Sequence, residues 1–468
     1  MKIKFCFTFL MIALTGIGAY AQTTEFDVNG LKVIFRHSDK YAVSAVMFYK
    51  GGTANYDASR QGIEDLALNA AVACGTRELT KDQFRDLADK YSVSIGSDAS
   101  YDYSYIGLSC VKPYFSEGWR LFSQAVLSPA FEAAEFAITR QKLISGIKER
   151  DSDPDAMLNR MSLDNAFTGS RYAYRPGGNA STMEQLTREQ ARDYYYNTLL
   201  NKNRMLLVVV GNLDINALKQ QVAAAFGTLP AAPVQLPAAE ESTFNSNSLN
   251  TVERNLATNY IQGIMGAPSL KNKKESYAFN LGFQILYDKL FEEVRTKRNL
   301  SYAPSAYAVA TFKPYSAIYV TTTKPKEAVD VMVNEVKRLH NNGFTETDLR
   351  DAKAQFATSY FMGKQSTYSM AYSLGTAEIN GTWKDEETML SDLQGIPLET
   401  VQKVFNRYAT GIRWNYLGDE KLADKEAFSR PVAMPLVEKA NEKVIERNRD
   451  IRPMTKPKME VNLPREKQ

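Results

Sequence analysis

The sequence predicts an α/β protein of the α+β sandwich type, built from one mixed unit of strands and helices that occurs twice. Segments with a period of two residues alternate with segments of helical period along the whole chain. The same order of elements appears in both halves, which indicates an internal duplication. Of the 468 residues, 44% are hydrophobic and 24% charged, a composition typical of globular domains with sizeable cores.

The first half is predicted to begin with strands and to end with a strand followed by a helix. In the segment 101–111, Tyr101, Tyr103 and Tyr105 fall on one side and Ile106, Leu108 and Cys110 on the other, as in a strand with two different faces. The predicted order is strands at 26–36 and 42–50, helices at 62–73 and 81–91, a strand at 101–111, helices at 113–127 and 133–150, a strand at 205–210 and a helix at 215–226.

The second half is predicted to repeat this order after a linker. The linker is rich in Pro, Ala, Ser, Asn and acidic residues and has almost no periodicity. A helix at 277–298, strands at 305–312 and 316–323, and helices at 325–340 and 346–361 then follow. The expected division is a signal peptide at 1–21, an N-terminal domain at 22–229, a linker at 230–250, a C-terminal domain at 251–430 and a basic tail at 431–468.

The first residues have the layout of a secretory signal peptide. Lys2 and Lys4 precede the apolar run 5–13, and Ala19 and Ala21 form a small-x-small cleavage site. The run is short for a membrane span, although an uncleaved anchor is the alternative. We expect a protein exported across the inner membrane, periplasmic or extracellular, without stable membrane insertion.

Charge and cysteine content add two expectations. The net charge is +4, but the segment 443–468 alone carries eight Lys and Arg against four Asp and Glu. The basicity therefore belongs to the tail, and we expect no nucleic-acid partner. Cys74 and Cys110 remain after the signal peptide, and the sequence leaves open whether they are bridged.

A resemblance to a known family begins at the first predicted helix. The run Gly-Ile-Glu-Asp-Leu-Ala-Leu-Asn at 62–69, followed by Gly75 and Thr76, resembles the zinc-binding region of the pitrilysin/insulinase metallopeptidases. The resemblance extends from Phe26 to about Phe428. It implies two homologous α/β domains arranged as a half-clam.

The residues that bind zinc in that family are replaced here. Family members carry His-x-x-Glu-His on a helix, with a distant Glu as the remaining ligand. Counted from Gly62, the resemblance places the two His positions at Asp65 and Asn69, the catalytic Glu at Leu68 and the distant ligand at Gly146. A register shifted by one residue gives Leu66, Asn69 and Ala70 instead.

The number of histidines shows that the zinc motif is missing whichever register of the helix is correct. The chain contains two His, His37 and His340, which lie in opposite halves, and no His-x-x-Glu-His in either orientation. Zinc catalysis normally uses ligand sets rich in His. We therefore expect no metal and no cofactor in this chain, with zinc only on a partner, and we expect both His at the surface.

A second family motif is retained. Residues 294–302 resemble the second-half motif in which an Arg and a following Tyr bind substrate and stabilise the oxyanion. The resemblance makes Arg295 and Tyr302 candidates for these roles. The alternative is that Arg295 ends a charged helix and Tyr302 is a core aromatic residue.

The segment 94–100 resembles the edge strand on which the family holds its peptide substrate by strand addition. The candidate substrate-strand residues are Gly96, Ser97, Asp98 and Ala99. The Gly and Ser content fits close approach of another backbone, and it fits a plain hairpin equally well.

The sequence thus favours an exported, zinc-less subunit that does not hydrolyse peptides alone. It would pair with a zinc-bearing relative and supply Arg295 and Tyr302 to a shared peptidase site. The alternative is a structural or peptide-binding scaffold with no role in hydrolysis. A nucleophilic enzyme has no support, because no Ser or Cys has an evident His base.

Overall fold

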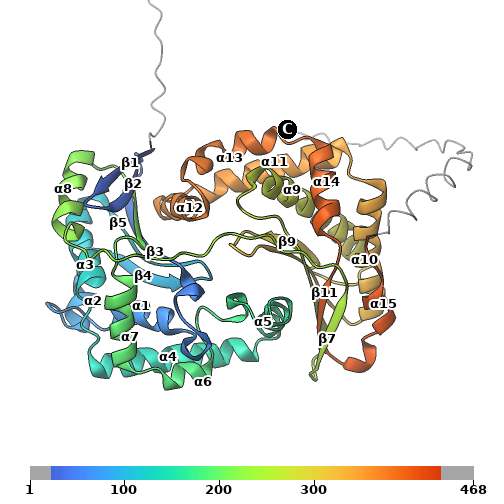
Figure 1. Cartoon of the computed structure of the whole chain (residues 1–468), viewed down its shortest axis with the longest axis horizontal. Coiled ribbons are helices and arrows are strands. Elements are labelled where there is room, and N and C mark those ends of the chain that lie inside the picture. Colours follow the sequence, from blue (N-terminus) through green and yellow to red (C-terminus); the bar gives the residue numbers. More distant parts are fainter. Residues whose placement is uncertain (1–22, 434–468) are drawn as a thin grey trace, which may run out of the picture.

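The computed structural model describes residues 23–433, which form two α/β halves side by side (Figure 1). The predicted signal peptide and nearly all of the predicted basic tail lie outside these residues. Each half contains one mixed sheet, and the predicted fold class is confirmed.

The first half is built on a six-stranded sheet with the order β1-β2-β6-β3-β5-β4. Only β2 and β6 are parallel. β6 reads as a continuous apolar run because its residues are buried on both faces of the sheet. The strands are β1 (Thr23–Val28), β2 (Leu31–His37), β3 (Ala42–Lys50), β4 (Ser94–Ala99), β5 (Tyr103–Val111) and β6 (Met205–Gly211).

The first two strands correct one sequence prediction. We expected a single strand at 26–36, but β1 and β2 form an antiparallel hairpin. Asn29 and Gly30 both have positive φ, at 50° and 92°, as a two-residue Asn-Gly hairpin turn requires. The Asn29-Gly30 pair was the sequence feature that could have predicted this hairpin.

Except for α5, the helices of the first half cover one face of this sheet, where they form the main apolar core. The longest helix ends at Ser152 because Pro154 cannot continue it, and the Asp153 side chain caps the next helix by accepting from the Ala156 backbone N–H. The helices are α1 (Ile63–Ala73), α2 (Lys81–Lys90), α3 (Phe115–Leu127), α4 (Ala133–Ser152), α5 (Pro154–Ala166), α6 (Ala180–Gln185), α7 (Arg188–Tyr194) and α8 (Ile215–Phe226).

The second half repeats the topology of the first. Its sheet has the order β7-β11-β8-β10-β9, with β7 and β11 parallel and the other pairs antiparallel. The first sheet has the same sequence of pairings from β2 to β4. The strands are β7 (Ser248–Glu253), β8 (Asn259–Met265), β9 (Ser305–Val309), β10 (Tyr315–Thr322) and β11 (Arg413–Gly418).

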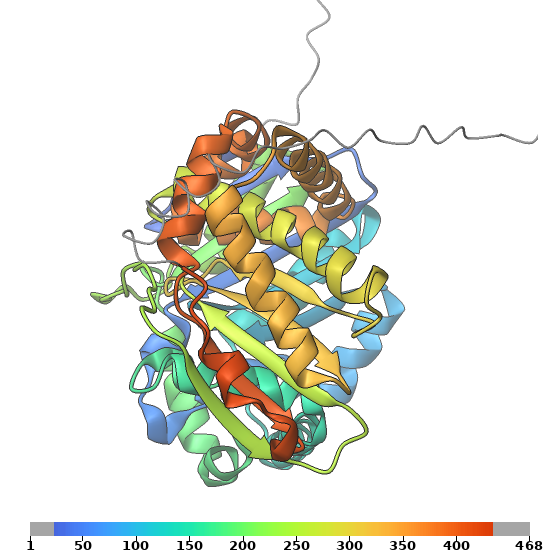
Figure 2. The same ribbon diagram turned by 90° about the vertical axis from the view of Figure 1, so that its right-hand side faces the viewer.

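Helices of the second half lie across the outward face of this sheet (Figure 2). α9 continues directly into the π-helical turn η6 (Phe291–Thr296), which carries Arg295. The helices are α9 (Lys273–Leu290), α10 (Pro325–Asn342), α11 (Glu346–Gly363), α12 (Thr367–Asn380), α13 (Lys384–Gln394), α14 (Leu398–Tyr408) and α15 (Lys425–Ser429).

The two halves exchange one helix each. α12, from the second half, covers the free face of the first sheet, where Ala371 and Leu374 pack against Phe48 and Val208. α5, from the first half, covers the second sheet in the same way, through Leu163. In Figure 1 both helices lie between the two sheets. Neither sheet is therefore covered on both faces by its own half alone.

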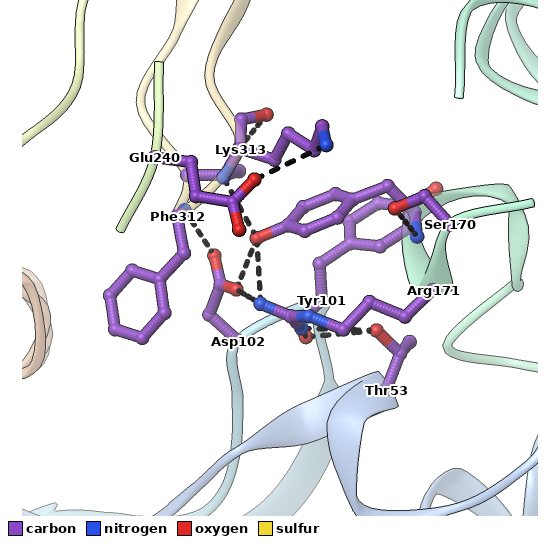
Figure 3. Close-up of polar contacts among 10 residues, drawn as sticks. Thr53, Tyr101, Asp102, Ser170, Arg171, Glu240, Phe312 and Lys313 are labelled. Atoms are coloured by element: carbon purple, nitrogen blue, oxygen red, sulfur yellow. Dashed lines mark hydrogen bonds and ion pairs between the residues drawn. The ribbon is translucent and has the colours of Figure 1, made fainter. Parts of the chain in front are cut away.

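A buried carboxylate fastens the halves at the β4–β5 turn (Figure 3). Asp102, 3% exposed, accepts hydrogen bonds from Arg171 Nη2 at 2.8 Å and from the Tyr172 hydroxyl. Its second oxygen accepts from the backbone N–H of Phe312 at 2.9 Å, in the β9–β10 turn of the other half. The backbone N–H of Lys313 donates to the Tyr172 hydroxyl. One carboxylate thus connects turns about 210 residues apart in the chain.

The structure can be compared with the sequence predictions for the linker, for His340 and for the two cysteines. The segment predicted as a linker at 230–250 is irregular up to residue 247, but β7 begins inside it at Ser248. The expectation of a surface His340 is wrong: His340 is 4% exposed and its Nε2 lies 2.6 Å from the Ala409 carbonyl oxygen. Cys74 and Cys110 are both buried free thiols.

Candidate functional site

The helix that corresponds to the family's zinc helix is α1, and it presents two polar residues away from the core. Asp65 and Asn69 are partly exposed, whereas Leu68 is fully buried. In the alternative register, Leu66 and Ala70 are both fully buried. The face of α1 that solvent reaches is therefore the one defined by Asp65 and Asn69.

These two side chains bind each other. Asn69 Nδ2 donates to Asp65 Oδ1 at 2.9 Å, one helical turn away. Desolvation raises the pKa of Asp65 to about 7, and repulsion from Asp98 adds to this, while Arg150 and Asn69 lower it. At the two positions that counting from Gly62 assigns to the family's His residues, the chain therefore has an amide and a carboxyl group.

The carboxylate next to this pair points the other way. Glu64 is 1% exposed and accepts hydrogen bonds from Asn55 Nδ2 at 3.0 Å and from the Tyr194 hydroxyl. Burial raises the pKa of Glu64, and these hydrogen bonds oppose the shift. Glu64 belongs to the core that joins α1 to α7, and it is not available as a ligand beside Asp65.

The position of the distant ligand is Gly146 on α4, and a Cβ there would meet open space. One turn further along the same helix, Arg150 lies near the site. A Cβ on Gly177 would lie 3.4 Å from Arg150 Nη2 and 3.6 Å from Asp65 Oδ2, so the guanidinium and the carboxyl flank the same glycine. Arg150 also lowers the pKa of both Asp65 and Asp98. The sequence reasoning missed Arg150, although its i+4 spacing from Gly146 was visible.

This donor set does not fit zinc. Asp65 and Asn69 provide oxygen atoms only, Leu68 and Gly146 provide none, and a guanidinium lies beside them. Across residues 23–433 no three His, Cys, Asp or Glu side chains gather as a possible metal site. Metal-assisted hydrolysis by this half therefore has no ligand set.

The candidate substrate strand β4 is an edge strand, hydrogen-bonded to β5 on one side only. Gly96 has open space at its Cβ position, and the Ser97 hydroxyl is buried without a hydrogen-bond partner among the described residues. Asp98 is exposed, and desolvation raises its pKa, while the backbone N–H of Ala99 and Arg150 lower it. β4 thus offers an unpaired backbone edge close to Asp65.

The structure brings Arg295 and Tyr302 together on the second half. The Arg295 guanidinium lies 4.1 Å from the centre of the Tyr302 ring and 4.7 Å from that of Phe291. Tyr302 is 79% exposed, so it is not a core aromatic residue. Within the described part of the chain, no hydrogen bond or ion pair links either residue to α1 or β4. The stack holds a cation and a phenol side by side at the surface.

Comparison with known proteins fits this geometry. Residues 185–356 match the family model described as the peptidase M16 inactive domain. Over the rest of the chain, the α1 helix lies where the family's zinc helix is expected but lacks its ligands. The chain therefore resembles the pitrilysin/insulinase-like M16 peptidases, as a relative without the zinc motif.

Individual relatives agree with this assignment. The chain is 22% identical over 366 residues to the non-peptidase homolog YmxG of Helicobacter pylori, covering 75% of this chain and 82% of that protein. A solved protease structure from the same organism superposes with a TM-score of 0.78 and 15% identity, over 85% of this chain and all of the other.

A larger relative in fold is the periplasmic protease PqqL of Escherichia coli. It superposes with a TM-score of 0.70 at 15% identity and covers 94% of this chain, which spans about half of PqqL. Both structural similarities concern the fold alone. No helix among residues 23–433 is long and apolar enough to cross a membrane.

Proposed function

We propose that this chain is the non-catalytic subunit of an exported, two-chain M16 peptidase. A zinc-bearing relative would supply the metal and the attacking water, and this chain would supply Arg295 and Tyr302. The guanidinium and the phenol would bind the peptide substrate and donate to the oxyanion of the tetrahedral intermediate.

The single observation that carries this proposal is the exposed Arg295–Tyr302 stack. A tyrosine ring 79% exposed gains little from burial, and the stacked guanidinium fixes its orientation. The pair presents a cation and a phenolic hydroxyl together to solvent, as binding of a developing oxyanion requires. Meanwhile the positions that would bind zinc hold Asp65, Leu68, Asn69 and Gly146. The chain therefore keeps the groups that stabilise charge and lacks those that generate the nucleophile.

Reconstitution with a candidate zinc-bearing chain tests the proposal. Alone, the purified chain should contain far less than one zinc per molecule and show no peptidase activity. In the mixture, Arg295→Ala or Tyr302→Phe should lower kcat by about 10²–10³, with a smaller effect on KM. Arg298→Ala is a matched control, because Arg298 follows the same turn and bonds Glu293 at the surface.

Complex formation must be measured for the same variants. If both variants assemble normally and still support full turnover, Arg295 and Tyr302 have no catalytic role. If the chain alone contains stoichiometric zinc, the proposal that only the partner chain supplies the metal is wrong.

A second function is favoured by β4, namely that the chain holds extended peptides without cleaving them. Its unpaired edge and the open space at Gly96 suit an added strand. Gly96→Pro would introduce a ring and a fixed φ at the open edge and should weaken binding of an extended peptide. Unchanged affinity would exclude β4 as the peptide site.

A further inference from the structure

A polar cavity of about 190 Å³ lies beyond the end of β4. Its walls come from Tyr101 in the turn after β4, the end of α4, one side of α5 and the loop 173–178. Tyr101 lines it at the strand end, and three arginines line it from the other elements: Arg150, Arg160 and Arg175. No role in the proposed peptidase site uses this cavity.

The three guanidinium groups are not equally neutralised. Asp151 Oδ1 lies 2.8 Å from Arg175 Nη1 and 3.5 Å from Arg160 Nη1, and Asp164 Oδ2 lies 3.5 Å from Arg160 Nε. Asp151 and Asp164 thus neutralise the charges of Arg160 and Arg175. Arg150 forms no hydrogen bond or ion pair through its side chain within residues 23–433, and the carboxyl groups of Asp65 and Asp98 interact with its charge only from beyond ion-pair distance.

One further hydrogen-bond donor in the cavity wall lacks an acceptor. Arg175 Nη2 is buried and has no hydrogen-bond partner among the described residues. A buried donor without a partner costs free energy, so an oxygen acceptor close to it would be favourable. The cavity therefore contains one guanidinium without an ion pair, that of Arg150, and one unpaired N–H donor on Arg175, whereas its lining residues Asp151 and Asp164 are already paired.

The cavity wall is rigid where it meets α1. Gly178 has a φ of 72°, and a Cβ there would lie 2.7 Å from the Gln61 carbonyl oxygen. The Arg175 backbone N–H donates to Gln61 Oε1 at 3.1 Å. The loop that carries Arg175 is therefore packed against the entry to α1, and this packing together with the Asp151 ion pair positions the Arg175 guanidinium before a ligand arrives.

We propose that this arginine pocket binds a carboxylate of a peptide paired along β4. The inference rests on the second proposed function, peptide binding at β4, and adds the chemical class that the site selects. A peptide that extends past Ala99 reaches Tyr101 and the pocket. The carboxylate comes from an acidic side chain or from the peptide's C-terminus, and Arg150 is its main partner.

Three fluorescent decapeptides of alternating Thr and Val distinguish the two sources. The first carries one Glu and a C-terminal amide, the second carries Gln and a free C-terminus, and the third carries Gln and an amide. Anisotropy titration of the purified chain should give about 10-fold tighter binding for one of the first two than for the third. This preference should shrink at high salt.

Arg150→Gln should abolish the preference and leave the affinity for the third peptide unchanged. Arg120→Gln on α3 is the matched control, because Arg120 is also exposed and free of ion pairs in the described chain. Both arginines are at the surface, so neither variant should affect folding. Equal binding of all three peptides by the unmodified chain would overturn the carboxylate pocket but leave peptide binding at β4 intact. Absence of binding for all three would overturn both.

Discussion

Replacing Asp102 by Asn should loosen the joint between the two halves. Asp102 Oδ1 accepts from Arg171 and Tyr172, and Oδ2 accepts from the backbone N–H of Phe312. Asn keeps one acceptor oxygen and replaces the other by an NH2 group. In either orientation, that NH2 would face a donor. The substitution also removes the charge that neutralises Arg171, whose side chain is 18% exposed.

The expected cost follows from these losses. A buried hydrogen bond to a charged group contributes about 1.5–3 kcal/mol, and leaving a buried charge unpaired costs about 3–5 kcal/mol. Because Asn retains one acceptor, we expect the free energy of unfolding to fall by about 2–4 kcal/mol. A double-mutant cycle with Arg171→Gln should give a coupling energy of about 1–3 kcal/mol.

Urea unfolding followed by far-UV circular dichroism and tryptophan fluorescence measures this effect. Trp119 lies in the core of the first half and Trp414 in that of the second, so fluorescence reports on both. In the variant the two probes should no longer give one coincident transition, because the halves are less tightly coupled.

Asp82→Asn is the control for this experiment. Asp82 pairs with Arg85 at 3.1 Å, but both side chains are largely exposed. Such a pair contributes at most about 0.5–1 kcal/mol. If Asp102→Asn costs no more than Asp82→Asn, the buried carboxylate does not hold the halves together, and their coupling resides in α5 and α12 alone.

Three further variants have outcomes that follow from the structure. Gly375→Ala should lower the free energy of unfolding by about 1–3 kcal/mol, because its Cβ would overlap the buried ring of Phe48. Gly146→Ala, facing open space inside a helix, should raise it by about 0.5–1 kcal/mol, and chemical denaturation that gives both variants the same sign would contradict this. Asp65→Asn should stabilise the chain progressively from about pH 4 to pH 7 and by a constant amount above, since the raised pKa makes folded Asp65 keep a proton that the unfolded chain releases. Melting temperatures at four pH values check this, and a difference independent of pH would refute it.

Local patterns were sufficient for most elements of the fold. The helix predicted at 215–226 is α8 with the same bounds, because the Asp214 side chain caps it and its apolar residues repeat at helical spacing. α12 was not predicted. Its buried residues Met370, Ala371 and Leu374 pack on a sheet more than 150 residues away in the chain. The sequence of α12 shows which residues are apolar, but its partner is determined only by the tertiary fold.

In the candidate site, too, some features follow from the local sequence and others depend on the tertiary fold. The count of two His was sufficient to predict that the zinc ligands are missing, since no fold can supply residues that the chain lacks. The rotation of α1 is a tertiary property: it turns Glu64 into the core and Asp65 outward. The approach of Arg150 to Asp65 depends likewise on how α4 packs beside α1. The sequence therefore shows that the His ligands are missing, whereas the proximity of Arg150 to Asp65 becomes visible only in the fold.

The exchanged helices explain why a half without zinc ligands remains in the chain. α5 covers residues Ile264, Tyr315 and Ala317 of the second sheet, all buried. Without the first half, these side chains would face water, and the sheet that positions the Arg295–Tyr302 turn would lose one of its two apolar layers. The first half thus buries one face of the second sheet, whatever its own chemistry. Under the proposed function, a requirement for Arg295 and Tyr302 would therefore preserve the architecture of the first half, even though its candidate zinc positions are Asp65, Leu68, Asn69 and Gly146.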